Sequence, residues 1–283
     1  HLWARGAVGV IGGSPKCCKT WLALELAVAV ASGRPCLGRF AVPAAGPVLL
    51  YAAEDAPLHL RQRLEALAEA RHADFPSLDI HLIVEPSLRI DRPLDVERLR
   101  ATLERCHPRL LILDPYVRLQ RVDENNATEV SAILATLRDL SRTFDAALLL
   151  VHHARKSPSD HPGHAGQTLR GSSDFHAWGD SNLYLRRRAQ DLVLTVEHRA
   201  AAAPRPLTLG LVEHPLHLEI RDAEGAAPMR TTMEQRVVAA LAHGPRHLED
   251  LRTAVGARKQ SVADSLRLLE ATGSVVRQVE GWG

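Results

Sequence analysis

The sequence predicts an α/β fold: a mostly parallel β-sheet with helices on both faces, followed by a small helical domain. Three observations predict it. Apolar runs of four or five residues alternate with helical stretches from Gly6 to about Val151, which is typical of strands covered on both sides. Later segments alternate apolar and polar residues like consecutive antiparallel strands. A turn-rich segment that contains Gly225 and Pro228 then precedes a series of short helices.

The elements of the sheet follow one another in a regular order. The expected strands are 8–11, 48–51, 80–84, 110–113 and 147–151, with helices at 21–31, 57–72, 94–107 and 127–144. Antiparallel strands are expected at 182–185, 192–196 and 207–212, after a polar loop at 156–168. Because the carboxyl ends of parallel strands line the ligand crevice in such sheets, polar residues directly after strands are candidate site residues.

The chain is predicted to contain two domains. Residues 1–220 form the α/β domain, 221–230 a linker, and 231–283 a second domain. Helices are expected there at 233–243, 248–255 and 259–272, followed by an apolar run at 275–279. This order predicts a winged helix-turn-helix domain with a truncated wing.

Composition narrows the functional classes. The chain has 283 residues, 46% of them hydrophobic, and a net charge of +2, so any nucleic-acid contact must come from local patches or from a ring of subunits. Its four cysteines show no CxxC pairing, which favours a reduced, cytoplasmic setting. No apolar run is long enough to span a membrane. The chain starts without methionine, and we expect it to be a fragment or a trimmed form.

The most informative segment joins the first strand to the first helix. The phosphate-loop pattern G-x-x-x-x-G-K-[ST] is met at Gly13, Lys19 and Thr20, but Cys18 replaces the second glycine. In such a loop the backbone N–H groups surround a β-phosphate, the lysine reaches the β and γ oxygens, and the hydroxyl binds Mg²⁺. We expect Cys18 to hold the turn if its φ stays negative. The residues expected to bind ATP are Gly13, Ser14, Pro15, Lys16, Cys17, Cys18, Lys19, Thr20 and Trp21.

Acidic residues follow two of the other strands. Glu54 and Asp55 come after the second strand, where a carboxylate can orient or deprotonate the water that attacks a γ-phosphate. We choose Glu54 as the base and Asp55 as the N-cap of the next helix. Asp114 ends the apolar run 110–113, and its carboxylate is expected to hold Mg²⁺ together with Thr20.

Histidines close the strand at 147–151. Either His152 or His153 could hydrogen-bond a γ-phosphate and act as a sensor, although polar residues that simply close a strand are the alternative. His161 and His164 have a metal-like spacing, but no cysteine or acidic partners surround them, so zinc is not expected there.

Together these motifs resemble the RepA-like branch of the RecA-like ATPases, which includes hexameric plasmid replicative helicases and many AAA-family ATPases. The resemblance covers about residues 6–212. It implies ATP and Mg²⁺ as ligands, Lys19 and Thr20 at the phosphates, and a homo-oligomer such as a hexamer, acting on DNA. It also implies Glu54 as the base, Asp114 as the metal ligand and His153 as the γ-phosphate sensor. The motifs that carry it are 13–23, 51–55, 113–115, 152–156 and 170–173.

Such enzymes are completed by an arginine from a neighbouring subunit. RepA-like helicases carry it about ten residues after the Arg-Gly-Ser-Ser segment, where this chain has Asp180. DnaB-type helicases carry it on the following strand, which matches Arg199. Arg199 is therefore the first choice and Arg186 or Arg170 the reserves, although surface charge is the commoner role of arginine.

Two regions are candidates for contact with DNA. The third helix of the second domain resembles a recognition helix, with Arg258, Lys259, Gln260 and Arg267 as candidate contacts; docking of a protein is the alternative there. In a ring, single-stranded DNA could also follow loops that carry Arg118, Arg121, Arg155 and Lys156, which could equally be ordinary surface loops.

Three functions fit these observations. The first is an ATP-driven DNA motor or remodeller. The second is a nucleotide-regulated DNA-binding switch with little hydrolysis, which the replacements at Cys18 and Asp180 favour. The third, a small-molecule kinase, lacks an evident lid or acceptor site. We conclude that the chain is a P-loop ATPase and regard the motor as the first hypothesis.

Overall fold

The computed structural model describes residues 1–84, 87–121, 126–153 and 172–221, and near the carboxyl terminus residues 237–238, 240–241, 244, 247–257, 259–271, 275, 277–278 and 281–282. The chain divides into two compact units, His1–Asp222 and Ala223–Gly283. None of the helices described is long and apolar enough to cross a membrane.

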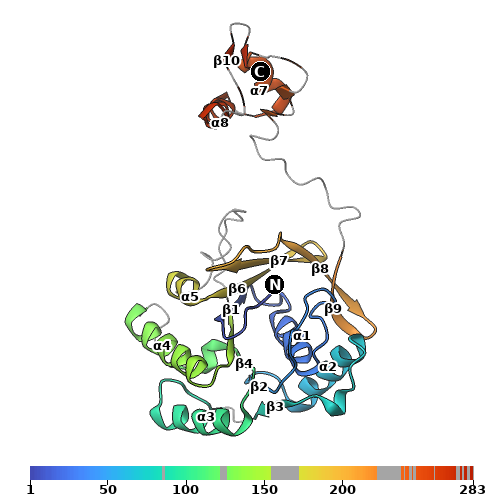
Figure 1. The fold of residues 1–283 in the computed structure, drawn as a ribbon, viewed down its shortest axis with the longest axis vertical. Helices are drawn as coiled ribbons and strands as arrows, with labels where there is room; N and C mark the ends of the chain where they lie inside the picture. The colour runs from blue at the N-terminus through green and yellow to red at the C-terminus, as the bar shows by residue number, and fades with distance from the viewer. Residues whose placement is uncertain are drawn as a thin grey trace. The chain divides into compact units, whose positions relative to one another are not determined.

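The first unit is built on one nine-stranded sheet. Its strands are β1 (Val8–Gly13), β2 (Val48–Ala52), β3 (Ile80–Ile83), β4 (Leu110–Asp114), β5 (Ala147–His153), β6 (Ser181–Arg188), β7 (Asp191–His198), β8 (Leu207–Glu213) and β9 (Leu216–Ile220). Their spatial order is β3-β2-β4-β5-β1-β6-β7-β8-β9. The first six strands of this spatial order, from β3 across to β6, are parallel to one another. Strands β7, β8 and β9 continue the sheet with antiparallel pairings. The predicted α/β class is therefore confirmed (Figure 1).

Helices cover both faces of this sheet (Figure 1). One apolar core joins the sheet to α1 (Lys19–Ser32) and α2 (Pro57–Ala70). A second core on the other face joins it to α3 (Pro93–Cys106), α4 (Ala127–Thr143) and α5 (Ser172–Trp178). In the central parallel strands, successive residues contribute to opposite cores, as the period of a strand requires. In β1, for example, Val10 packs on the second core and Ile11 on the first.

Two elements were not predicted. The short helix α5 begins at Ser172, inside the Arg-Gly-Ser-Ser segment, and places Phe175 and Trp178 in the second core. Strand β9 pairs with β8 and forms an edge of the sheet. It brings Leu218 into the core beside α1 and α2.

A buried ion pair joins this edge of the sheet to the helices. Glu25 of α1 is fully buried, and its Oε1 accepts hydrogen bonds from Arg71 Nε at 2.6 Å and Leu37 N at 2.7 Å. Arg71 in turn donates from Nη2 to Leu218 O at 2.9 Å. One carboxylate therefore holds the end of α2, the loop after α1 and β9 together, in the way a buried charge must be compensated.

The second unit contains α7 (Leu248–Val255) and α8 (Lys259–Ala271), and the antiparallel pair β10 (Arg277–Gln278) and β11 (Gly281–Trp282). Residues 237, 238, 240 and 241 are helical, while the rest of the helix expected at 233–243 lies outside the described residues. The unit has an apolar core of its own. Helices followed by a hairpin agree with the order expected of a winged helix-turn-helix domain, which stays a prediction.

Candidate active site

The phosphate loop lies between the end of β1 and the start of α1. Its first residue, Gly13, sits against the neighbouring strand β6: a Cβ at this position would lie 2.3 Å from Leu185 O and 2.7 Å from Cys17 Sγ. Only glycine fits such an approach. Glycine is therefore required at position 13 because the neighbouring strand leaves no room for a side chain, and not only because the chain turns there.

The loop contains two non-glycine residues in the left-handed conformation. Lys16 has φ 63° and Cys18 has φ 61°. The expectation that Cys18 keeps a negative φ is therefore wrong. It occupies the backbone conformation in which glycine is preferred, and each such residue costs about 1–2 kcal/mol. The loop keeps its shape at the expense of backbone strain.

Cys18 is also the N-cap of α1, and no side chain caps this helix end. The first turn carries no acidic residue. A helix start of this kind has N–H groups and a positive dipole end to offer to an anion. Ser14, Pro15 and Lys16 are exposed around it, whereas Cys17 is buried in the core.

Lys19 lies inside the loop. It is 4% exposed, and its Nζ donates to Gly13 O at 3.0 Å and Ser14 O at 2.9 Å. Burial lowers the pKa of this ammonium, and the nearby Cys17 and Asp114 oppose the shift. A buried cation held mainly by carbonyl oxygens is poised for an anion such as a phosphate, which would compensate its charge fully.

Thr20 and Asp114 are brought together as predicted, from segments far apart in the chain. Thr20 Oγ1 donates to Asp114 Oδ2 at 2.7 Å. Asp114 is 8% exposed at the end of β4. Burial raises its pKa to about 6, the Thr20 hydrogen bond opposes this, and the charges of Asp55 and Glu54 add to it. A hydroxyl beside an undercompensated carboxylate is a hard-oxygen pair of the kind that fits Mg²⁺.

Glu54 and Asp55 follow β2, whose Ala52 pairs in register with Asp114. Glu54 Oε1 accepts from Arg118 Nε at 3.1 Å, and both side chains are about half exposed, at 48% and 60%. Asp55 is not the helix cap that we expected. The N-cap of α2 is Ala56, and Asp55 instead accepts from Arg63 Nη1 at 2.6 Å.

Trp21 takes part in the same cluster of side chains. The guanidinium group of Arg63 lies over the Trp21 ring, 5.6 Å from its centroid. The capping prediction fails because α2 begins at Pro57, so that Ala56 is the N-cap and Asp55 lies one residue before it. Asp55, Arg63 and Trp21 link the loop after β2, α2 and α1.

The two histidines at the end of β5 have different environments. His152 is 2% exposed and stacks on Phe175, with 4.3 Å between ring centroids, while Tyr116 meets it edge-on. His153 pairs in register with Gly13, the first residue of the phosphate loop. The structure thus places His152 in the core and His153 beside the loop.

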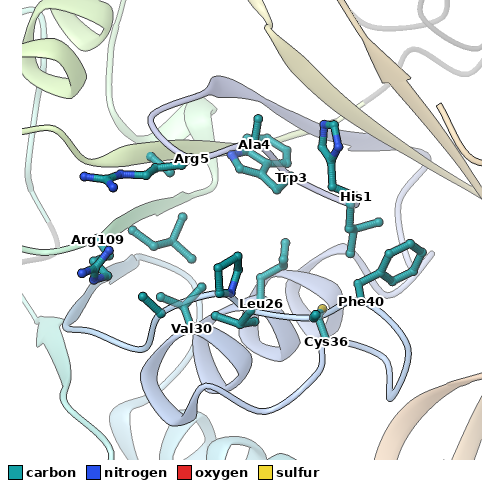
Figure 2. A pocket seen from close by; sticks show the side chains of 16 residues that line it. His1, Trp3, Ala4, Arg5, Leu26, Val30, Cys36, Phe40 and Arg109 are labelled. Carbon is teal, nitrogen blue, oxygen red and sulfur yellow. The ribbon is translucent and has the colours of Figure 1, made fainter. Parts of the chain in front are cut away.

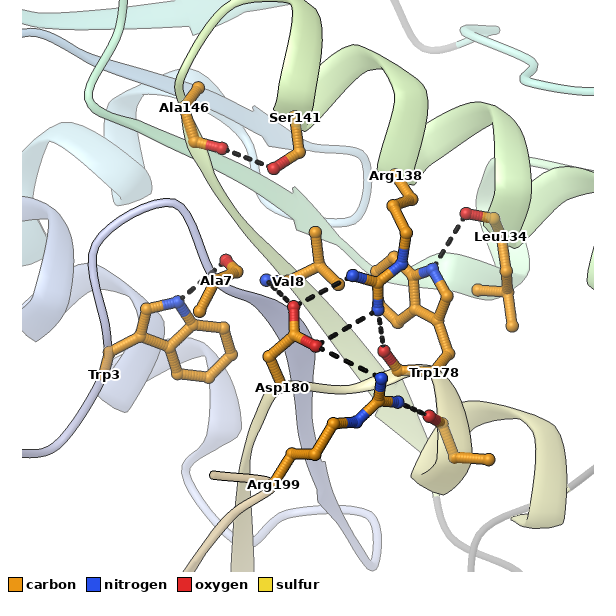
Figure 3. Close-up of polar contacts among 11 residues, drawn as sticks. Trp3, Ala7, Val8, Leu134, Arg138, Ser141, Ala146, Trp178, Asp180 and Arg199 are labelled. Carbon is orange, nitrogen blue, oxygen red and sulfur yellow. Dashed lines mark hydrogen bonds and ion pairs between the residues drawn. The ribbon is translucent and has the colours of Figure 1, made fainter. Parts of the chain in front are cut away.

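Arg199 follows β7 at the other end of the sheet. Its Nη1 lies 3.7 Å from Asp180 Oδ1, and its Nη2 donates to Ala177 O (Figure 3). Asp180 is a centre of contacts: Arg138 Nη1 donates to its Oδ2 at 3.0 Å, and Val8 N donates to the same oxygen at 3.3 Å (Figure 3). Arg199 therefore lies by the first residue of β1, away from the phosphate loop of its own chain.

The reserve residues lie elsewhere. Arg186 is on β6, and Arg170 lies outside the described residues, as do Arg155, Lys156, His161 and His164. Sequence reasoning missed Arg187, the arginine of β6 that contacts the phosphate loop. Its Nη2 donates to Lys16 O at 3.1 Å. Leu183 and Leu185 lie two residues apart and face the first core. This alternation could have distinguished Arg187 from its neighbours Arg186 and Arg188, because Arg187 continues it.

The candidate DNA-binding residues are only partly described. Arg258 and the side chain of Lys259 lie outside the described parts. On α8, Gln260 Nε2 and Arg267 Nη1 both contact Asp264 Oδ1, at 3.0 Å and 2.9 Å. Arg121 follows the short helix η2 (Tyr116–Arg118), and its backbone N donates to Asp91 Oδ2 at 3.0 Å.

Of these residues, none that the structure describes lines an apolar cavity of about 470 Å³. Trp3, Val30 and Phe40 line it, with Arg5 and Arg109 at one end (Figure 2). It also includes Leu110 and Ala147, the first residues of β4 and β5. Since these strands are parallel to β1, the cavity is at the opposite end of the sheet from the phosphate loop.

Solved structures share this fold. One solved ATPase domain aligns with a TM-score of 0.58 and 13% identity, over 78% of this chain and 86% of that one. A DnaB-like replicative helicase, solved in a study of its interactions with primase, aligns with a TM-score of 0.58 and 16% identity, over 76% of this chain and 57% of that one. The RadB recombinase aligns with a TM-score of 0.55 and 17% identity, over 77% and 93%. The fold is RecA-like.

The family follows from the phosphate-loop half of the chain. The model of the AAA domain family matches residues 1–159, which include the loop, Thr20, Asp114 and both histidines. With the loop intact between strand and helix and the hydroxyl–carboxylate pair formed beside it, the chain is a P-loop ATPase and belongs to the AAA domain family.

Proposed function

We propose that this protein is a DNA-associated motor or remodeller of the RepA-like helicase type, which hydrolyses ATP with Mg²⁺ in a homo-oligomer such as a hexamer. The observation that carries the proposal is the 2.7 Å hydrogen bond between Thr20 Oγ1 and Asp114 Oδ2 at the mouth of the phosphate loop. It joins the hydroxyl that follows the loop lysine to the carboxylate at the end of β4, as nucleotide hydrolysis requires.

The loop residues bind and orient the triphosphate in this proposal. The N–H groups of residues 16–19 surround the β-phosphate, and Lys19 exchanges its bonds to Gly13 O and Ser14 O for the β and γ oxygens. Thr20 and Asp114 would hold Mg²⁺, which would neutralise the charge of the phosphates. The raised pKa of Asp114 supports this role, since a cation would compensate its charge.

Two further residues of the same edge act on the γ-phosphate. Glu54 orients the attacking water and takes its proton, because it follows β2 next to Asp114. His153 donates to the γ-phosphate while it is present and loses this contact after hydrolysis, since it lies in register with Gly13. His152 is excluded from such a role by its stacking in the core.

Arg199 supplies the positive charge between subunits. Its side chain is 54% exposed and lies at the end of the sheet opposite the loop, so it acts on the nucleotide of a neighbouring subunit. An arginine supplied in this way stabilises the charge that develops on the transferred phosphate.

DNA contacts are proposed for both units. Residues Arg258, Lys259, Gln260 and Arg267 serve duplex DNA through the winged-helix domain, and the segments with Arg118 and Arg121 follow single-stranded DNA in a ring. On α8, Asp264 already engages Gln260 and Arg267. Their contribution to binding therefore requires that DNA phosphates compete with a carboxylate.

The test is ATP turnover with and without single-stranded and duplex DNA. The parent should hydrolyse ATP, and DNA should stimulate it. Lys19→Ala and Glu54→Gln should each reduce turnover by about 100-fold or more. Arg199→Ala should do the same only if subunits assemble, which mixing it with Glu54→Gln protein can establish by partial recovery of activity. Turnover that needs Lys19 but ignores DNA would rule out the motor.

A second candidate function is a nucleotide-regulated DNA-binding switch. The observation that favours it is the ion pair of Glu54 with Arg118, because the proposed base then has one oxygen occupied. In this function Arg118→Ala should raise basal ATP turnover, whereas Arg121→Ala, on a neighbouring exposed arginine, should leave it unchanged. Equal turnover in both variants would remove the support for the switch.

A further inference from the structure

Arg187 reaches from the sheet to the strained turn of the phosphate loop. Its Nη2 donates to Lys16 O at 3.1 Å. It also lies close to the Cys18 thiol: burial raises the pKa of this thiol, and the guanidinium charge of Arg187 opposes that shift. One side chain thus contacts Lys16 and lies beside Cys18, the two loop residues with positive φ.

The pleat of β6 explains why Arg187, and not its neighbours, lies there. Leu183 and Leu185 pack in the core shared with α1 and Cys17, whereas Tyr184 packs in the core on the other face. Side chains alternate between faces along a strand. Arg187 therefore shares the loop's face of the sheet, while Arg186 and Arg188 belong to the opposite face.

The loop needs an external contact because its backbone is strained. In the glycine-containing pattern, the residue before the lysine adopts a left-handed conformation without penalty. Here Cys18 adopts it, after Lys16 has done the same. Non-glycine residues in such conformations persist where the surrounding structure holds them. The hydrogen bond from Arg187 to Lys16 O is a contact of that kind, made from a rigid strand.

We propose that Arg187 is a positioning residue of the phosphate loop, which holds the strained turn from Lys16 to Cys18 in the shape that receives the nucleotide triphosphate. It performs the task that glycine at position 18 would make unnecessary. This inference deepens the proposed function and rests on ATP binding to the loop.

The first experiment compares two arginines of the same strand. ATP affinity is measured with a fluorescent ATP analogue and Mg²⁺ for the parent, Arg187→Ala and Arg188→Ala. Removal of a charged hydrogen-bond donor at an exposed site should weaken binding by about tenfold in Arg187→Ala. Arg188→Ala should bind like the parent, because its side chain belongs to the other face. Arg187→Lys should recover part of the affinity.

The steady-state parameters separate positioning from loss of structure. Arg187→Ala should raise the KM for ATP by about tenfold and leave kcat at saturating ATP within about twofold, because the loop is restored once the nucleotide binds. The urea midpoint of the nucleotide-free variant should stay close to that of the parent. A general loss of structure would lower that midpoint and kcat together.

The decisive experiment is rescue by glycine. In the Cys18→Gly background the turn no longer needs support, so adding Arg187→Ala should weaken ATP binding by less than about twofold. If Arg187→Ala weakens binding equally with cysteine and with glycine at position 18, or if it has no effect with the native cysteine, the inference is overturned. If the parent itself binds no ATP, the failure belongs to the proposed function instead.

Discussion

Two carboxylates at opposite ends of the same sheet differ in their roles: one holds the fold together, and the other belongs to the candidate active site. Asp180, before β6, accepts from Val8 N and is paired with Arg138 and Arg199. Asp114, at the end of β4, accepts from Thr20 and has a pKa raised by burial to about 6.

The two carboxylates differ in how far nearby positive groups compensate their negative charge. The charge of Asp180 is matched by the guanidinium groups of Arg138 and Arg199 within its own chain. The charge of Asp114 is offset only in part, by the Thr20 hydrogen bond and the nearby Lys19, while burial and the charges of Asp55 and Glu54 add to its cost. A buried carboxylate without compensation lowers stability unless a cation arrives. The carboxyl edge of the sheet is therefore the edge built for a ligand.

The largest expected difference between the two carboxylates is in activity. Asp114→Asn should reduce ATP turnover by about 100-fold or more, because the amide cannot bind Mg²⁺ as a carboxylate does. Asp180→Asn should keep ATP affinity within about threefold of the parent, since this residue lies at the far end of the sheet. Turnover by Asp114→Asn within threefold of the parent would contradict the assignment of the metal ligand.

Removal of Asp180 should have the larger effect on stability. Asp180→Ala leaves Val8 N–H without this acceptor and two partly buried guanidinium groups without their shared carboxylate (Figure 3). We expect a loss of about 2 kcal/mol in the free energy of unfolding, reduced from the fully buried case because these side chains are 21–54% exposed. Urea denaturation measures it, with Asp139→Ala as a control at the exposed pair with Arg100. A loss no larger than that of the control would mean that Asp180 does not hold this end together.

Asp114→Asn should increase the free energy of unfolding, whereas Asp180→Ala should decrease it. The folded pKa of about 6 lies above the ordinary 3.8, so the ionised carboxylate costs stability at every pH above 6. The nucleotide-free variant should therefore be more stable than the parent at pH 8, by about 2 kcal/mol. This gain should shrink as the pH falls from 6 to 4, because the folded parent takes up a proton first. Urea midpoints of both proteins across this range provide the measurement, and a gain independent of pH would exclude ionisation as its cause.

The smallest expected effect concerns the strained turn. Cys18→Gly should stabilise the nucleotide-free protein by about 1 kcal/mol, because glycine adopts the left-handed conformation without steric penalty. Cys17→Ala should give no such gain, since Cys17 is buried in the core. Differential scanning calorimetry can compare the two. A Cys18→Gly protein less stable than the parent would indicate that thiol contacts outweigh backbone strain.

Local patterns predicted most of the fold. Strands β1, β2, β4 and β5 are short apolar runs, and the segments between them show the spacing of apolar residues expected of helices. Both kinds of element could therefore be recognised from the sequence. The helix α5 was missed because it has only seven residues, too few for a helical period. Strand β9 was missed although the residues Leu216–Ile220 alternate; it follows Pro215 and lies at the edge of the sheet.

The positions of site residues could be predicted where the order of the strands determines them. They could not be predicted where they depend on contacts between individual side chains. Crevice geometry brought Thr20 to Asp114 and His153 to Gly13 as expected. The roles of Asp55 and Cys18 depended on local conformation: α2 begins one residue too late for Asp55 to cap it, and Cys18 adopts a left-handed turn. The contact of Arg187 with the loop needs the pairing of β1 with β6, which no local pattern contains.

The most direct test of the central claim is calorimetric titration of the folded protein with ATP, with and without Mg²⁺, for the parent, Lys19→Ala and Asp114→Asn. The account predicts saturable binding that depends on Lys19, is strengthened by Mg²⁺ in the parent, and gains nothing from Mg²⁺ in Asp114→Asn. Absence of saturable binding, or an equal Mg²⁺ dependence in the parent and Asp114→Asn, would contradict it.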